Sequence, residues 1–532
     1  MTERSSDFAP LSDVQNRNTE LSEADLEAFR RVPEADPTTP DQIDVPEGTR
    51  RALQVVDAAP LSSQKPDTLV SLAVGATASI AAGMTAFAIV AGIVLAIIVP
   101  PWYRSLEPRY QAIWCNRVSL LCELKEKRDT DNVYQLNVNP DNVVEQSDAL
   151  VATETPTPTL MPTNTDTPVP TEAEAAAAAT RMPTATDIPP SPTTTPSPTA
   201  TPFTVPMRDT LQLSKLKWEE QGWNNCGPTT LTIGLTYFGY TDNQRRAANF
   251  LKPNIEDTNV SPNQMVAYVN TVAGPELGIN ALYRVGGDRE LLMRLVANDF
   301  PVIVERGIIL PEDGWMGHYS LIVGYDSVSE EYLLFDSYYG YSGGEGRRYE
   351  KEFIEEGWRQ FNYVFIVLYE PHQADLLSDL LGEHADPAMA AQIALDRARD
   401  QVRRNPDDKW AWFNVGTSYT LLENYQDAAL AYDRAFTMNQ EFRMLWYQFG
   451  PYVAYYNTGR YSDVLALALA TEKTTEYVEE TYYYRGLVYA AQGNTDSAIF
   501  QFDRAISHNE NFTPAIEAKQ SVLEGRFSAP SG

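Results

Sequence analysis

Apolar positions first dominate the chain between Thr68 and Val99, a stretch without a single charged residue and rich in Ala, Ile and Val from Ala76 onward. A helix of this length crosses the roughly 30 Å hydrocarbon layer of a bilayer. A long polar tail precedes it, which is unlike a cleaved secretory signal. The pattern predicts one membrane-spanning helix at 68–100. The alternative is a buried helix of a soluble domain.

Two segments lack the apolar periodicity from which a core is built. Residues 1–67 carry seven Arg/Lys and fourteen Asp/Glu, and residues 152–206 contain 13 Pro and 17 Thr among 55 residues. Such compositions favour disorder, so we expect an acidic disordered tail and a Pro/Thr-rich disordered linker that serves as a stalk. Residues 101–151 between span and stalk read as a juxtamembrane helix and linker. That helix suits either the membrane surface or dimerisation.

The orientation of the predicted span is not decided by charge. Three basic residues precede the span closely and three follow it: Arg50, Arg51 and Lys65, then Arg104, Arg109 and Arg117. The positive-inside rule therefore gives a tie. Pro/Thr-rich stalks usually hold a domain away from a cell surface. This habit favours a single-pass protein of the cell membrane with extracytoplasmic folded domains.

The apolar pattern of the C-terminal third repeats after 70 residues. Six positions recur: Trp412, Gly416, Tyr419, Ala428, Tyr432 and Ala435 return as Tyr482, Gly486, Tyr489, Ala498, Phe502 and Ala505. The shift is about twice the roughly 34-residue tetratricopeptide period, and the residues resemble that family's signature. We expect all-α TPR-like repeats over 385–525, with an extra helix at 386–406. Such solenoids bind a peptide or protein partner, although a purely structural role stays open.

A lone cysteine stands at the start of another apolar run. Apolar residues from Leu231 to Phe238 predict a helix of about 12 residues that begins near Cys226, with Pro228 in its first turn and Gly239 as its stop. Unpaired N–H groups at a helix N-terminus favour a thiolate. Cys226 is therefore a candidate nucleophile. The alternative is a small buried hydrophobic residue.

Candidates for the other parts of a cysteine hydrolase follow in the same segment. His318 lies in an alternating run typical of a strand and is a natural general base. The next run, Tyr332 to Asp336, predicts the returning strand of a hairpin, with Asp336 within about two residues of the His318 region and able to orient the ring. Gln221 precedes Cys226 by five residues, where its amide is placed to hold an oxyanion.

These residues resemble the papain-like peptidases of family C thirty-nine, in particular the stand-alone C39-like branch. The match covers about residues 207–370 and rests on these motifs: Gln221 with Asn224-Asn-Cys226-Gly-Pro228, Lys252-Pro-Asn254, Asp257-Thr-Asn-Val-Ser-Pro262, Phe300-Pro-Val302, Gly314-Trp-Met-Gly-His318 and Phe335-Asp336. The resemblance implies a papain-like α+β domain at 207–371. It also implies Cys226 as nucleophile, His318 as base, Asp336 as orienter and Gln221 in the oxyanion hole.

The chain departs from the best-known relatives, which cut leader peptides while fused to an ABC exporter. It has no Gly-x-x-x-x-Gly-Lys-Ser/Thr phosphate loop and only one apparent membrane segment. The resemblance therefore implies cysteine-dependent amide cleavage but not leader-peptide processing. Related domains also include acyl transferases and inactive proteins.

Composition narrows the remaining function classes. The formal net charge of −31 opposes phosphate backbones, so we expect no nucleic-acid partner. Three cysteines exclude a disulfide scaffold, and Cys115 and Cys122 are about 10 Å apart along a continuous helix, so they are free or paired between molecules. Four histidines without a Cys/His cluster make a metal site improbable. We expect no cofactor.

The sequence thus predicts a multidomain, membrane-anchored thiol peptidase that hydrolyses peptide bonds through a Cys-His-Asp triad. Its substrates are peptides or proteins, and the repeats recruit a substrate or a protein partner. The alternative is an inactive peptidase-like surface protein that binds peptides. The joint presence of Gln221, Cys226, His318 and Asp336 favours the enzyme.

Overall fold

The computed structural model describes residues 140–152, 210–310, 313–339 and 346–530, together with Val99, Tyr103, Gln111, Tyr134 and Leu136. The predicted acidic tail lies outside these residues. So does the predicted membrane span, except for Val99, and so does the predicted stalk, except for Ala152. Cys115 and Cys122 also lie outside them. Within the described ranges, no helix is both long and apolar enough to cross a membrane.

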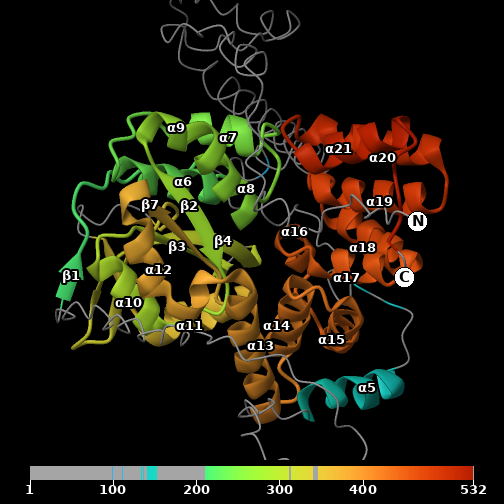
Figure 1. Ribbon diagram of the computed structural model, residues 1–532, viewed down its shortest axis with the longest axis horizontal. Helices are drawn as coiled ribbons and strands as arrows, with labels where there is room; N and C mark the ends of the chain where they lie inside the picture. The colour runs from blue at the N-terminus through green and yellow to red at the C-terminus, as the bar shows by residue number, and fades with distance from the viewer. Residues whose placement is uncertain are drawn as a thin grey trace, which may run out of the picture. The chain divides into compact units, whose positions relative to one another are not determined.

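Residues 210–385 form a domain around one seven-stranded antiparallel sheet, here called the sheet domain (Figure 1). Its strands are β1 (Thr210–Gln212), β2 (Asn280–Arg284), β3 (Val302–Leu310), β4 (Gly314–Asp326), β5 (Glu331–Phe335), β6 (Arg347–Glu350) and β7 (Phe365–Tyr369). The order is β2-β7-β3-β4-β5-β6, and β1 pairs with β4. The predicted hairpin is present as β4–β5, with Asp326 opposite Glu331 and Leu321 opposite Phe335.

Helices cover both faces of this sheet. Leu321 and Val323 of β4 join a core with α6 (Cys226–Thr236), α7 (Gln244–Leu251) and α8 (Pro262–Tyr268). Ile322 between them joins a second core with α10 (Arg289–Ala297), α11 (Lys351–Trp358) and α12 (Ala374–Leu381). This alternation follows from the two-residue period of a strand. The sheet domain therefore continues through α12, beyond the predicted limit at residue 371.

The C-terminal helices form the repeat region, residues 387–530. They are α13 (Pro387–Arg404), α14 (Lys409–Leu421), α15 (Tyr425–Thr437), α16 (Met444–Tyr447), α17 (Gly450–Asn457), α18 (Tyr461–Thr474), α19 (Glu479–Ala491), α20 (Thr495–His508) and α21 (Thr513–Leu523). A Cβ on Gly416 would lie 2.7 Å from the Tyr432 ring, and one on Gly486 would lie 2.5 Å from the Phe502 ring. The 70-residue pattern therefore records the same close helix approach twice.

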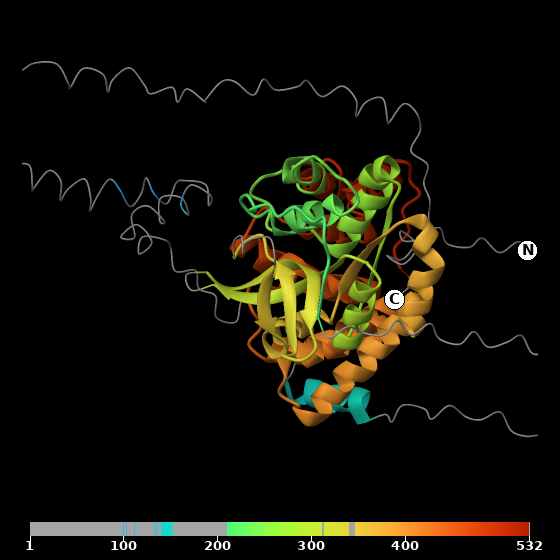
Figure 2. The same ribbon diagram turned by 90° about the vertical axis from the view of Figure 1, so that its left-hand side faces the viewer.

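One helix was not singled out from the sequence. Helix α5 (Pro140–Ala152) lies beside α13 and α15 (Figures 1 and 2). Its buried side chains Val143, Ser147, Leu150 and Val151 follow helical spacing, which is the signal that could have predicted it. Upstream, the buried Tyr134 hydroxyl donates to Phe442 O and accepts from Leu445 N–H at 3.3 Å. The described residues on either side of the Pro/Thr-rich segment, Ala152 and Thr210, therefore belong to the same compact unit.

This docking predicts that cutting the Pro/Thr-rich segment leaves the two fragments associated. A specific protease site is inserted between residues 160 and 200, the chain is cut, and the N-terminal fragment is captured by an affinity tag. We expect the repeat region to be captured with it. Because Leu150 and Val151 are at most 8% exposed, Leu150→Asp with Val151→Asp should separate the fragments. Gln146→Asp, on the exposed side of the helix, is the control. Separation of the unmutated fragments would contradict the prediction.

Candidate active site

Helix α6 places Cys226 at its first position. The Asn225 side chain does not cap the helix and instead donates to Gln244 Oε1 at 3.0 Å. The helix is held on β4 by the Thr230 hydroxyl, which donates to Tyr319 O at 3.2 Å. Nine successive residues after Cys226 are buried, whereas Cys226 itself is partly exposed. Cys226 therefore sits at a fixed helix N-terminus with part of its surface exposed to solvent.

His318 lies on β4 directly opposite Arg306 of β3 and is only 2% exposed. Its Nε2 is 3.0 and 3.1 Å from the two carboxylate oxygens of Asp336. Because Nε2 faces Asp336, Nδ1 is the ring nitrogen left for Cys226, whose side chain lies close enough to affect the pKa of the ring. Burial opposes the charged ring, but Asp336 and Cys226 together raise the pKa of His318 to about 9. The imidazolium form therefore persists through neutral pH.

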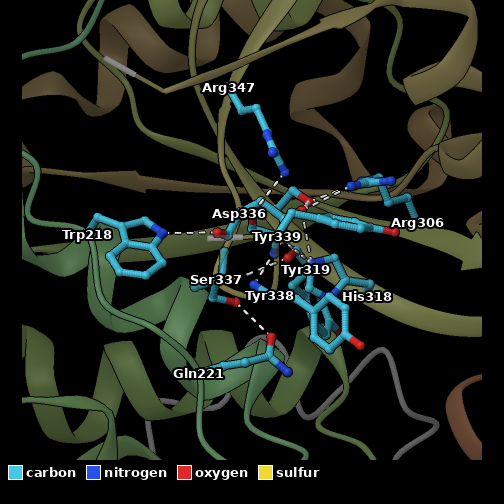
Figure 3. A network of polar contacts seen from close by, with 12 residues as sticks. Trp218, Gln221, Arg306, His318, Tyr319, Asp336, Ser337, Tyr338, Tyr339 and Arg347 are labelled. Carbon is cyan, nitrogen blue, oxygen red and sulfur yellow. Dashed lines mark hydrogen bonds and ion pairs between the residues drawn. The ribbon is translucent and has the colours of Figure 1, made fainter. Parts of the chain in front are cut away.

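Asp336 follows β5 and is buried within a set of donors (Figure 3). Arg306 Nη2 donates to its Oδ2 at 3.0 Å. The other donors are the Ser320 hydroxyl at 3.1 Å and the Tyr338 and Tyr339 N–H groups at 3.0 Å each. Burial alone would raise the pKa of Asp336, but His318, Arg306 and these hydrogen bonds hold it well below its usual range. The carboxylate is therefore an anion fixed in one orientation.

Sequence reasoning missed Arg306, which is 1% exposed. Its guanidinium also donates from Nε to Ser320 Oγ at 3.0 Å and lies 5.8 Å and 5.7 Å from the ring centroids of Tyr349 and Phe353. The available signal was the charged pair Glu305-Arg306 inside an otherwise apolar strand, since buried arginines are nearly always paired. Arg306 and His318 both contact Asp336 Oδ2, so the guanidinium places a second positive charge beside this carboxylate.

Gln221 is fixed by the residue that follows Asp336. Ser337 Oγ donates to Gln221 Oε1 at 2.9 Å, and Gln221 N–H donates to Ser337 O at 3.0 Å. Figure 3 shows the amide oxygen turned toward Ser337 and the nitrogen turned away from it. No partner for this nitrogen lies among the described residues, so it remains available as a donor.

The structure thus brings His318 and Asp336 into direct contact, sets Cys226 beside His318, and ties Gln221 to the Asp336 strand end. Their chemical roles stay predictions. Across the described ranges, no group of three or more His, Cys, Asp or Glu could hold a metal ion.

The chain thus combines two kinds of domain. One is an α+β, peptidase-like domain in which a cysteine-bearing helix packs on an antiparallel sheet, and the other is an all-α region of helical repeats. Residues 208–366 match the model of the Peptidase_C39 like family, and residues 479–512 match that of the tetratricopeptide repeat. The chain therefore contains a C39-like peptidase domain and a TPR repeat, and the predicted recognition is confirmed.

Two solved structures are similar to part of the chain. One is described as a C39-like peptidase from Bacillus anthracis, with 20% identity, 30% of this chain and 98% of that chain covered, and a TM-score of 0.25. The other is the peptidase domain of Streptococcus ComA, a bifunctional ABC transporter involved in a quorum-sensing pathway, with 17% identity, 29% and 98% covered, and a TM-score of 0.22. No curated protein matches the chain.

Proposed function

We propose that this protein is a cysteine peptidase that hydrolyses peptide bonds through Cys226, His318 and Asp336. One observation carries the proposal: His318 is buried between the Asp336 carboxylate, 3.0 Å away, and a partly exposed thiol at a helix N-terminus. Nucleophile, base and orienter in this order are the parts that acyl transfer from an amide requires.

In the proposed reaction, the Cys226 thiolate attacks the scissile carbonyl carbon, and the π electrons move to oxygen. The Cys226 N–H and the free amide nitrogen of Gln221 donate to this oxyanion. When the C–N bond breaks, imidazolium Nδ1–H of His318 protonates the leaving amine, which leaves a thioester and a neutral ring. His318 then takes a proton from water, hydroxide displaces the thiolate, and the carboxylic acid product leaves. Asp336 keeps its charge throughout.

We further propose that the peptidase is anchored to the cell membrane by the span at 68–100, with the sheet domain and the repeat region outside the cell. The uncharged apolar sequence of the span and the Pro/Thr-rich segment support this placement. The repeat region binds a protein partner or substrate. Its helices α14, α16 and α19 already contact the sheet domain, for example through Asn414 Nδ2 to Arg359 O at 2.6 Å, so a partner uses its other surfaces.

The test is cleavage of a diverse peptide library by the full chain, read by mass spectrometry, beside Cys226→Ala. We expect cleavage only with Cys226 present. We also expect kcat/KM to fall as pH rises through about 9, because the raised pKa of His318 keeps its proton, which the leaving amine needs, below that pH and releases it above. Equal cleavage by the Cys226→Ala chain, or none by either, would contradict the proposal.

A further inference from the structure

Lys252 is a buried cation next to the proposed nucleophile. It ends α7 and is 2% exposed, although lysine is almost never fully buried without a partner. Its Nζ donates to Asn225 Oδ1 at 3.4 Å and to Ile255 O at 3.3 Å. Asn225 directly precedes Cys226. These two long hydrogen bonds to neutral oxygens do not offset the cost of burying an ammonium group, so a charge partner is required.

Four acidic groups face Lys252 from three directions. Asp257 and Glu256 lie on its own loop, Cys226 lies on α6, and Glu479 lies on α19 of the repeat region. Burial lowers the pKa of Lys252, whereas each of these groups raises it. The next residue of α19, Glu480, is also buried, and burial raises its pKa well above the usual range. Lys252 is therefore within electrostatic reach of both Cys226 and the carboxyls of Asp257 and Glu479.

Asp257 and Glu479 are two buried carboxyls, 1% and 2% exposed, that act on each other. Asp257 Oδ2 has no hydrogen-bond partner in the described part of the chain. Burial raises the pKa of both groups, and for Asp257 the neighbouring Glu479 raises it further. Burial therefore opposes a full negative charge on both carboxyls, whereas the ammonium of Lys252 lowers the pKa of Asp257 and so favours its charged form.

The repeat region fixes this arrangement. Asn509 Nδ2 donates both to Glu479 Oε1 at 2.8 Å and to Leu251 O at 2.9 Å, next to Lys252. Gln264 Nε2 donates to Glu479 Oε1 at 3.2 Å, and Asn511 Nδ2 donates to Phe250 O at 3.0 Å. The end of α7 is therefore bound to the repeat region by Asn509, which also holds Glu479, and by Asn511.

We propose that Lys252 is a positioning residue of the active site: its ammonium, bonded to Asn225 and compensated across the domain interface by Asp257 and Glu479, favours the thiolate of Cys226. The inference rests on the proposed function. In consequence, the repeat region is a working part of the peptidase, because it supplies one of the two carboxyls that keep Lys252 charged.

The experiment measures the rate of Cys226 alkylation by iodoacetamide against pH in the full chain, resolved by peptide mass spectrometry. Lys252→Met keeps the length and removes the charge, and we expect it to raise the midpoint of the alkylation profile by about one pH unit, roughly tenfold slower labelling below the midpoint. Asp257→Asn or Glu479→Gln alone should change little, since the remaining carboxyl then ionises. Together they remove the negative charge that keeps the buried Lys252 protonated, so the double variant should raise the midpoint, as Lys252→Met does.

Asp408→Asn is the control, because it removes another contact of the interface, the 3.0 Å bond from Arg359, without touching Lys252. An unchanged midpoint in Lys252→Met, with a wild-type profile that still depends on His318, would overturn this inference and leave the proposed function standing. A wild-type midpoint near the free-thiol value of about 8.5 that ignores His318→Ala would instead overturn the proposed function. If Lys252→Met does not fold, the variant with both Asp257→Asn and Glu479→Gln is the test. An unchanged alkylation midpoint in that variant overturns the inference.

Discussion

Replacement of His318 by alanine is expected to lower kcat/KM for peptide cleavage by about 10⁴-fold or more. The ring is the proton donor to the leaving amine and the base for water, and its positive charge also stabilises the thiolate. All three effects are lost together, because the one ring is held between Asp336 and Cys226. The measurement is cleavage, at pH 7, of a peptide selected from the library.

His372→Ala provides the matched control, since the His372 side chain is 73% exposed and follows the last strand of the sheet domain. It should cleave like the wild type. The midpoint of thermal unfolding of both variants shows whether the fold is retained. A folded His318→Ala chain that keeps more than about one tenth of wild-type kcat/KM would contradict the assigned role.

The parts of the site that sequence could predict are those set by short-range rules. Cys226 begins its helix because Pro228 suits a first turn and apolar residues follow at core positions, and Gly239 adopts φ +90° after the helix ends at Thr236. Asp336 reaches His318 because a short turn fixes the register of the β4–β5 hairpin. In each repeat a glycine packs against an aromatic ring of the next helix, and this local contact requires the same residue types at the same spacing. The 70-residue period could therefore be recognised in the sequence.

The parts that sequence could not predict depend on pairings between distant segments. Arg306 serves Asp336 only because β3 and β4 align it with His318, a register that neither strand specifies alone. Glu479 reaches Lys252 across 227 positions of sequence, through a domain interface that leaves no periodic signal. The docking of α5 is a similar case. Its apolar stripe can be recognised in the sequence, but the surface of α13 and α15 that it covers cannot be predicted from the sequence. Local patterns thus predicted the candidate chemistry, and tertiary contacts supplied the groups that set its charge.

Asp336→Ala is expected to destabilise the sheet domain by about 3–5 kcal/mol, because it strands the guanidinium of Arg306 in the core without its counter-charge. The side chains of this pair are 1% and 0% exposed, so water does not replace the lost partner. Urea unfolding followed by tryptophan fluorescence measures the change. The double variant Asp336→Ala with Arg306→Met removes both charges, and we expect it to recover a large part of the lost stability.

The same pair of variants separates stability from catalysis. In the double variant the fold recovers, but His318 still lacks the carboxylate that orients its ring and favours its charged form, so peptide cleavage should stay low. Ser214→Ala, on the exposed loop after β1, is the control for both measurements. If the losses of stability in the two single variants simply add in the double variant, the Arg306–Asp336 contact contributes no coupling free energy. If cleavage returns with stability, Asp336 serves only the fold, and the orienting role assigned to it is wrong.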